Sequence, residues 1–114
     1  METINGCTVI AAAPEPATFG PEQAQGAYSV LIASFPADYP APPLHVHPHT
    51  DEAFYLAEGE ALFVLGDQEV AVAEGGFVFV PRGTPHTVKS TGKATRGILI
   101  ISPGNAEHRF EPVE

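Results

Sequence analysis

The chain has 114 residues, 44% of them hydrophobic, which predicts one folded domain with a modest core. Fourteen acidic residues against five lysines and arginines give a net charge of −9, which argues against nucleic acid or an anionic membrane as partner. The single cysteine, Cys7, has no partner for an internal disulfide and is expected to be a small buried apolar residue. No apolar run reaches the ~20 residues of a membrane span, so we expect a cytoplasmic protein.

The first 26 residues are expected to form a strand and an arm. Residues 8–12 favour a short strand, and residues 14–26, which contain proline, glutamine and glycine but no helical period, predict an ordered arm or loop. Residues 27–114 then complete the same single domain. Their first strand is predicted at 28–35, and it is followed by Pro36, Pro40, Pro42 and Pro43, a segment that cannot be helix or central strand.

Three of the five histidines, His45, His47 and His49, fall within five residues directly after that proline-rich segment. Residues two apart on an extended segment point to the same side, so His45 and His47 are expected to face one space. Glu52 follows shortly after. Two imidazoles and a carboxylate form most of the shell of a first-row transition metal, so we interpret this run as a metal half-site.

The sequence leaves two possible roles for each of two residues near this run, His49 and Asp51. His49 shares parity with His45 and His47, but Pro48 and the residues after His49 suggest a turn, so it belongs either at the rim of the site or in an exposed loop. Asp51 is an alternative ligand in place of Glu52, or it hydrogen-bonds within the turn.

The rest of the chain predicts short strands joined by tight turns. Gly66-Asp67 suits a two-residue hairpin whose first position needs a positive φ. Eight or more closely spaced strands indicate an all-β sandwich or barrel. The predicted strands are 53–56, 61–65, 69–73, 77–80, 86–89, 96–102 and one around 108–110.

A second half-site is expected at His86. It closes a frame made by Gly75, Pro81 and Gly83, whose glycines and proline would set turns on both sides of the 77–80 strand and fix the direction of the imidazole. His108, in the charged tail, is expected to be solvated.

The two segments resemble the paired motifs of the cupin superfamily. The first reads His-x-His-x4-Glu-x6-Gly from His45 to Gly59, and the second reads Gly-x5-Pro-x-Gly-x2-His from Gly75 to His86. Two positions depart from the family pattern, because Tyr39 stands where the first motif opens with glycine and Ser90 where the second closes with asparagine. Neither departure falls on a ligand position.

The resemblance implies a double-stranded β-helix, or jelly-roll barrel, over residues 27–114, with a metal inside one mouth. It implies that His45, His47, Glu52 and His86 are the ligands of one divalent ion, which is Fe, Mn, Ni, Cu or Zn, and that the protein is a homodimer. The resemblance also implies that Glu52 serves as the general base.

Parity from Glu52 points Phe54 and Leu56 inward, and parity from His86 does the same for Val88, which predicts an apolar substrate pocket beside the metal. Arg82, next to the second motif, is a candidate for the rim.

Residues 51–60 look especially like those of quercetin- and flavonol-dioxygenase-like cupins, which implies an oxidoreductase that acts on a small apolar, phenolic or enolic substrate. In that class the metal binds the substrate oxygen, the glutamate takes the proton and dioxygen attacks the ring. Two alternatives stay open: a non-redox metal-dependent lyase, isomerase or polyketide cyclase, and a non-catalytic module that binds a small ligand.

Overall fold

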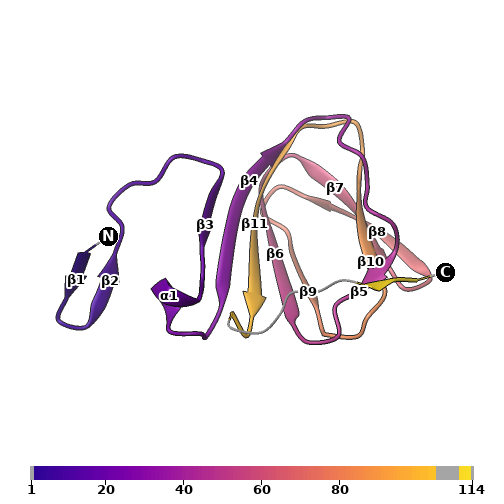
Figure 1. Cartoon of the computed structure of the whole chain (residues 1–114). Helices are drawn as coiled ribbons and strands as arrows, with labels where there is room; N and C mark the ends of the chain where they lie inside the picture. The colour runs from indigo at the N-terminus through magenta and orange to yellow at the C-terminus, as the bar shows by residue number, and fades with distance from the viewer. Residues whose placement is uncertain (1, 105–110, 114) are drawn as a thin grey trace.

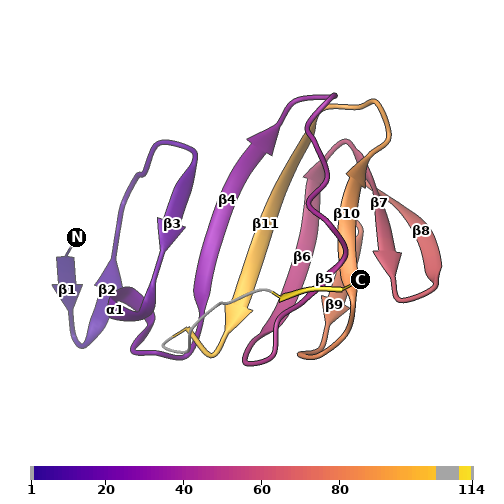
Figure 2. The same cartoon turned by 45° about the vertical axis from the view of Figure 1, so that its right-hand side comes forward.

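The computed structural model describes residues 2–104 and 111–113, and most of its strands lie in two five-stranded sheets that face each other (Figures 1 and 2). One sheet has the order β3-β4-β11-β6-β9 and the other the order β12-β5-β10-β7-β8. The elements are β1 (Glu2–Ile4), β2 (Cys7–Val9), β3 (Ala17–Phe19), α1 (Pro21–Ala24), β4 (Ser29–Phe35), β5 (His45–Val46), β6 (Asp51–Glu58), β7 (Glu60–Leu65), β8 (Gln68–Ala73), β9 (Phe77–Val80), β10 (His86–Ser90), β11 (Thr95–Ser102) and β12 (Glu111–Pro112).

The strand pairs among the described residues are all antiparallel, and none of them joins one five-stranded sheet to the other. The double-stranded β-helix is therefore present as two facing sheets, and the described strands do not close into a hydrogen-bonded barrel. This corrects the expectation of a closed barrel, while the all-β jelly-roll class is confirmed.

The core lies between the sheets, where alternate residues of each strand point. β9 shows the alternation most clearly, because Val78 and Val80 are buried while Phe77 and Phe79 are 63% and 55% exposed. Leu56 from the same sheet and Ala61 and Phe63 from the opposite sheet complete the buried cluster. Phe54 meets Phe63 edge-to-face across the sandwich, with ring centroids 5.2 Å apart.

The predicted strands of the body are confirmed to within one or two residues at their ends. The Gly66-Asp67 hairpin is also confirmed, since Leu65 pairs with Gln68 and Gly66 has φ +63°. The strand expected around 108–110, and with it His108, lies outside the described residues.

The N-terminal region differs from its prediction. The strand expected at 8–12 ends at Val9 and pairs with β1 in a hairpin that projects from one side of the sheets (Figure 1). The segment expected as an arm without secondary structure contains α1 and also β3, which adds to the edge of a sheet by pairing with β4. Cys7 is exposed on the hairpin, contrary to expectation, because the hairpin has no layer above it.

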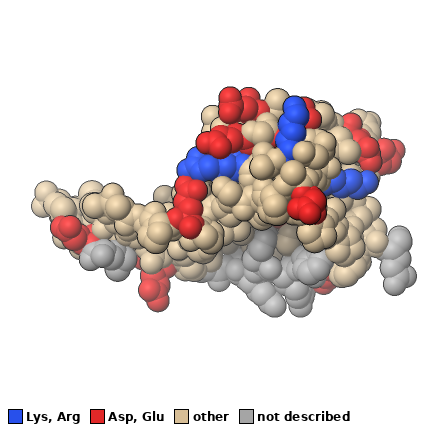
Figure 3. Space-filling view, turned by 90° about the horizontal axis from the view of Figure 1, so that it is seen from above, with Lys and Arg blue, Asp and Glu red and all other residues tan. Residues whose placement is uncertain are grey.

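Acidic side chains spread over the face of the sandwich seen from above, with a few lysines and arginines among them (Figure 3). No helix among the described residues is long and apolar enough to cross a membrane.

Candidate metal centre

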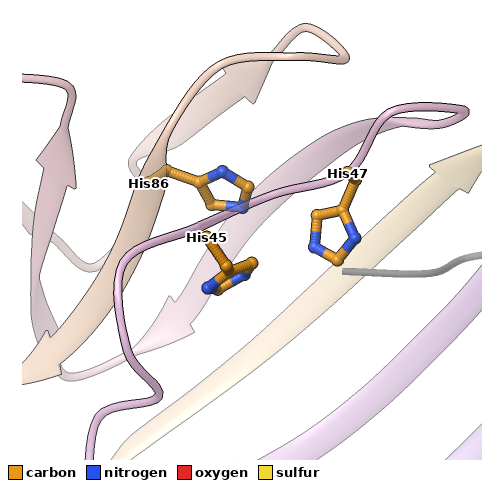
Figure 4. Close-up of side chains that lie close together, drawn as sticks. All are labelled: His45, His47 and His86. Atoms are coloured by element: carbon orange, nitrogen blue, oxygen red, sulfur yellow. The ribbon is translucent and has the colours of Figure 1, made fainter. Parts of the chain in front are cut away.

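Two neighbouring strands bring the first two histidines together. His45 on β5 is the register partner of His86 on β10, and their ring centroids lie 4.6 Å apart (Figure 4). Residues directly opposite in an antiparallel pair have their side chains on the same face, so both imidazoles enter the space between the sheets. His45 is 8% and His86 2% exposed.

The other two predicted ligands reach the same space from different directions. His47, just after β5, is buried, and its ring centroid lies 5.0 Å from that of His45 and 5.3 Å from that of His86. Glu52 is the second residue of β6, in the opposite sheet, and is also buried. Its Oε1 lies 2.6 Å from Nε2 of His47 and 3.2 Å from Nε2 of His86.

These spacings fit a single ion. The three histidines each offer a nitrogen, and these nitrogens all lie within 4.8 Å of one another. Around an ion with bonds of about 2.1 Å, opposite ligand atoms are about 4.2 Å apart and neighbouring ones about 3 Å. The donor set of three imidazoles and one carboxylate suits a first-row transition metal. The site could therefore hold a metal ion after small adjustments of side chains.

Backbone carbonyls orient two of the imidazoles. Nδ1 of His45 lies 2.7 Å from the carbonyl oxygen of Pro43, and Nδ1 of His86 lies 2.8 Å from that of Thr84. A carbonyl can only accept, so Nδ1 carries the proton in each ring and Nε2 is the nitrogen available to a metal. Partners of this kind fix the tautomer and the ring orientation of metal-binding histidines.

Opposing effects set the pKa of His86. Burial lowers this pKa, but the hydrogen bond to Glu52, the hydrogen bond to the Thr84 carbonyl and the negative charge of Glu52 together raise it above its ordinary value. Without a metal, protonated His86 donates from Nδ1 to Thr84 and from Nε2 to Glu52. A divalent ion would take the place of that second proton.

The motif glycines position the loops around the centre. Gly83 has φ +81°, and its N–H donates to the carbonyl of His47 at 2.9 Å, which ties the second loop to the first. Gly59 has φ +88°, and a Cβ there would lie 2.2 Å from the carbonyl oxygen of Ala94. Glycine is therefore required at the end of β6 by both conformation and space.

Asp51, Arg82 and His49 lie outside the converging group. The Asp51 carboxylate accepts from the backbone N–H of Arg82 at 2.9 Å and from its guanidinium at 3.1 and 3.2 Å. These hydrogen bonds lower the pKa of Asp51. Asp51 thus bonds to the second motif loop instead of its own turn, and Arg82 is half-exposed beside it. His49 is exposed in the bend before β6.

The predicted pocket residues Phe54, Leu56 and Val88 line a cavity of about 400 Å³ between the sheets. The four candidate ligands are absent from its lining, and the cavity extends from Phe54 and Val88 away from the histidines. Tyr39 and Pro42 also line it, although no spacing in the sequence assigns either of them to the pocket. The only signal for them was that Tyr39 stands at a position where glycine was expected.

Comparisons with known proteins agree with this fold. The family model described as "Cupin domain" matches residues 32–102. Quercetin 2,3-dioxygenase of Bacillus subtilis is 28% identical over 71 residues, which are 62% of this chain and 21% of that protein. Tetracenomycin polyketide synthase protein TcmJ of Streptomyces glaucescens is 33% identical over 60 residues, 52% of this chain and 40% of that protein.

A solved structure with a double-stranded β-helix domain, from Klebsiella pneumoniae, superposes with a TM-score of 0.65 at 21% identity and covers 78% of this chain and 76% of its own. The chain spans from about a fifth to about half of the length of the curated relatives that it matches.

Proposed function

Since the chain belongs to the cupin domain family, we propose that it is a mononuclear metal-dependent oxidoreductase of the dioxygenase type. The observation that carries this proposal is the convergence of His45, His47 and His86 with Glu52 in a buried space between two sheets. Four protein donors leave one or two coordination positions for small molecules, in contrast to a closed structural zinc site. The similarity to a quercetin 2,3-dioxygenase supports oxygen chemistry among the possible reactions.

The metal, one of Fe, Mn, Ni, Cu or Zn, would supply Lewis acidity and, where it is redox-active, a way to activate dioxygen. Glu52 would accept the proton of a phenolic or enolic hydroxyl that reaches the metal, because its carboxylate is buried among imidazoles. Phe54, Leu56 and Val88 would form the apolar wall that holds the carbon skeleton, and His49 and Arg82 would lie at the rim.

Metal content and oxygen consumption test this function together. Protein purified without added metal is expected to contain close to one transition-metal ion per chain by elemental analysis. Its oxygen uptake with a panel of phenols and enols is expected to disappear in Glu52→Gln and in His86→Ala. His49→Ala is the matched control, since His49 is an exposed histidine two residues from a ligand. Full metal content and full oxygen uptake in His86→Ala would refute the site.

A non-redox lyase, isomerase or polyketide cyclase is the second candidate, favoured by the similarity to a polyketide synthase protein. The same ligands would act on a carbonyl through Lewis acidity alone. Product formation from a polyketide-like substrate under strict exclusion of oxygen would establish this alternative. A non-catalytic ligand-binding module would bind such molecules unchanged under both conditions.

We also propose that two copies form a homodimer through the outer face of the β3-β4-β11-β6-β9 sheet. Phe77, Phe79, Tyr55 and Ile100 are exposed there, and Tyr55 pairs with Phe77 across neighbouring strands. A chain of net charge −9 repels its copies, and this apolar face is where two copies meet without like charges. Phe77→Glu is expected to give a monomer in light scattering, whereas Ala71→Glu, at an exposed alanine on the outer face of the other sheet, keeps the dimer.

A further inference from the structure

The cavity between the sheets lies toward the end of the sandwich that is opposite the metal centre. The strand register gives its position: His86 and Leu65 pair at one end of the β10–β7 ladder, and Ser90 and Ala61 pair at the other. Ala61, together with Thr95 and Phe35 at the matching end of the other sheet, lines the cavity. The cavity begins at Phe54 and Val88. Each of them is two residues after a candidate ligand on the same strand, Glu52 or His86, and two residues of an extended strand span about 7 Å.

The proline-rich segment forms a strap over one side of this cavity. Two side-chain hydroxyls of β10 hold residues 36–43 by hydrogen bonds. Ser90 donates to the carbonyl of Ala37, and Thr87 donates to that of Pro42 at 2.7 Å. Between these two hydrogen bonds, Tyr39 and Pro40 line the cavity. A strap that is stiffened by proline and fixed at both ends holds its wall in place before a ligand arrives, which lowers the entropic cost of binding.

Among the residues that the structure describes, the lining has no charged side chain and few polar atoms. Tyr39, Tyr55 and Thr95 are the lining residues with a polar side-chain atom. The Thr95 hydroxyl is already bound to the carbonyl of Glu60 at 3.0 Å, and Tyr55 is an exposed residue of the outer face. Tyr39 is half-buried, and its ring stacks at a tilt on Phe35, with centroids 5.4 Å apart. By elimination, the Tyr39 phenol is the candidate hydrogen-bonding group among the described lining residues.

We propose that this cavity binds a small neutral molecule, hydrocarbon-like and up to about two fused rings in size, which enters at the Phe35 and Tyr39 end and hydrogen-bonds to the Tyr39 hydroxyl. A volume of about 400 Å³ suits a ligand of that size. We do not expect an ionised ligand, because none of the described lining residues could pair with its charge and burying an unpaired ion is costly; the net charge of −9 further opposes an anion. Phe35, which is 41% exposed, marks where the cavity reaches solvent.

The proposed ligand would be the substrate of the proposed oxidoreductase. Only the reaction of the bound molecule rests on that proposed function. Binding itself needs no metal, because none of the four candidate ligands lines the cavity. A protein that binds the ligand without turnover would refute the oxidoreductase and leave the cavity site standing. Turnover of charged substrates by a protein that does not bind neutral molecules would refute the cavity site and leave the oxidoreductase standing.

Binding of 1-naphthol to metal-free and metal-loaded protein, followed by its fluorescence, tests the proposal. The same dissociation constant is expected in both forms, and 1-naphthoate, of the same ring size but ionised, is expected to bind about tenfold or more weakly. In methyl NMR spectra, naphthol is expected to shift the signals of Leu31, Leu56 and Val88 more than that of Val80, which lies opposite Glu52 at the metal end.

Two variants complete the test. Ala33→Leu fills the cavity and is expected to weaken naphthol binding about tenfold or more, whereas Ala71→Leu, at an exposed position of β8 that does not line the cavity, leaves it unchanged. Tyr39→Phe keeps the ring but is expected to abolish the preference for naphthol over naphthalene. Binding that requires the metal, accepts naphthoate equally well or persists unchanged in folded Ala33→Leu would overturn the proposal.

Discussion

Replacing Glu52 by glutamine separates the electrostatic role of this side chain from its shape. Glu52 is 4% exposed, and its Oε1 lies 2.6 Å from Nε2 of His47 and accepts a hydrogen bond from Nε2 of His86 at 3.2 Å. A hydrogen bond between charged groups contributes about 1.5–3 kcal/mol, and the amide oxygen of glutamine recovers part of it. We expect metal-free Glu52→Gln to lose about 2–3 kcal/mol of unfolding free energy near pH 6, which lowers Tm by about 8–12 °C in a chain of this length.

The unfolding free energy lost in Glu52→Gln is expected to decrease as the pH rises. Because the folded protein holds the pKa of His86 above its ordinary value of 6.5, protonated His86 contributes stability that is complete below pH 6.5. That contribution disappears as the pH rises through the raised pKa. The difference between the metal-free wild type and Glu52→Gln should therefore be largest at pH 6 and smaller at pH 9.

Urea denaturation followed by circular dichroism at several pH values measures both effects. Asp51→Asn is the matched control, because Asp51 is the adjacent carboxylate but bonds to a half-exposed arginine, and solvent screens such an ion pair. The reasoning is refuted if both variants lose the same stability, or if the difference between wild type and Glu52→Gln is constant from pH 6 to pH 9.

Three further outcomes are expected. Zinc added to metal-free protein near pH 6 should release protons into a weakly buffered indicator solution, because an ion replaces the proton between His86 and Glu52; an unchanged indicator would contradict this. Gly59→Ala should destabilise more than Gly66→Ala, since both positions have positive φ but only at Gly59 would the new Cβ meet the carbonyl of Ala94, and equal melting temperatures would count against the close approach. Because burial raises the pKa of Tyr39, an ultraviolet titration of the folded protein should contain a late phenolate step that is missing from Tyr39→Phe.

The strand pattern and the four converging residues are the features that the sequence predicts best. Histidines two apart on an extended segment share a face whatever the surroundings, and a glycine with positive φ ends a strand for local reasons. The pairing of His45 with His86 also follows once both motifs are placed in one fold. The partners of the imidazole Nδ1 atoms, in contrast, are backbone carbonyls of Pro43 and Thr84, and no residue type marks a carbonyl in a sequence.

Features that depend on packing were out of reach of the sequence. In β9, two phenylalanines alternate with two valines, so parity shows which residues share a face but not which face is inside. The sheets bury the valines and leave Phe77 and Phe79 exposed. The region before β4 was equally undetermined, because β3 contains only three residues and is stabilised by pairing with β4 instead of by its own propensity.

The two departures from the family motifs are connected in space. Ser90, which replaces the closing asparagine, donates its hydroxyl to the carbonyl of Ala37, and Tyr39, which replaces the opening glycine, lies two residues further along the same strap. Thr87, on the same strand as Ser90, holds the other end of the strap at Pro42. Both departures therefore shape the end of the cavity that is far from the histidines, while all four ligand positions keep the family's residue types. A strap fixed by side chains of β10 replaces the turn that glycine would make, and it brings a phenol to the cavity. The proposed metal site therefore rests on residues that the chain shares with its family, and the proposed ligand preference rests on residues that it does not share.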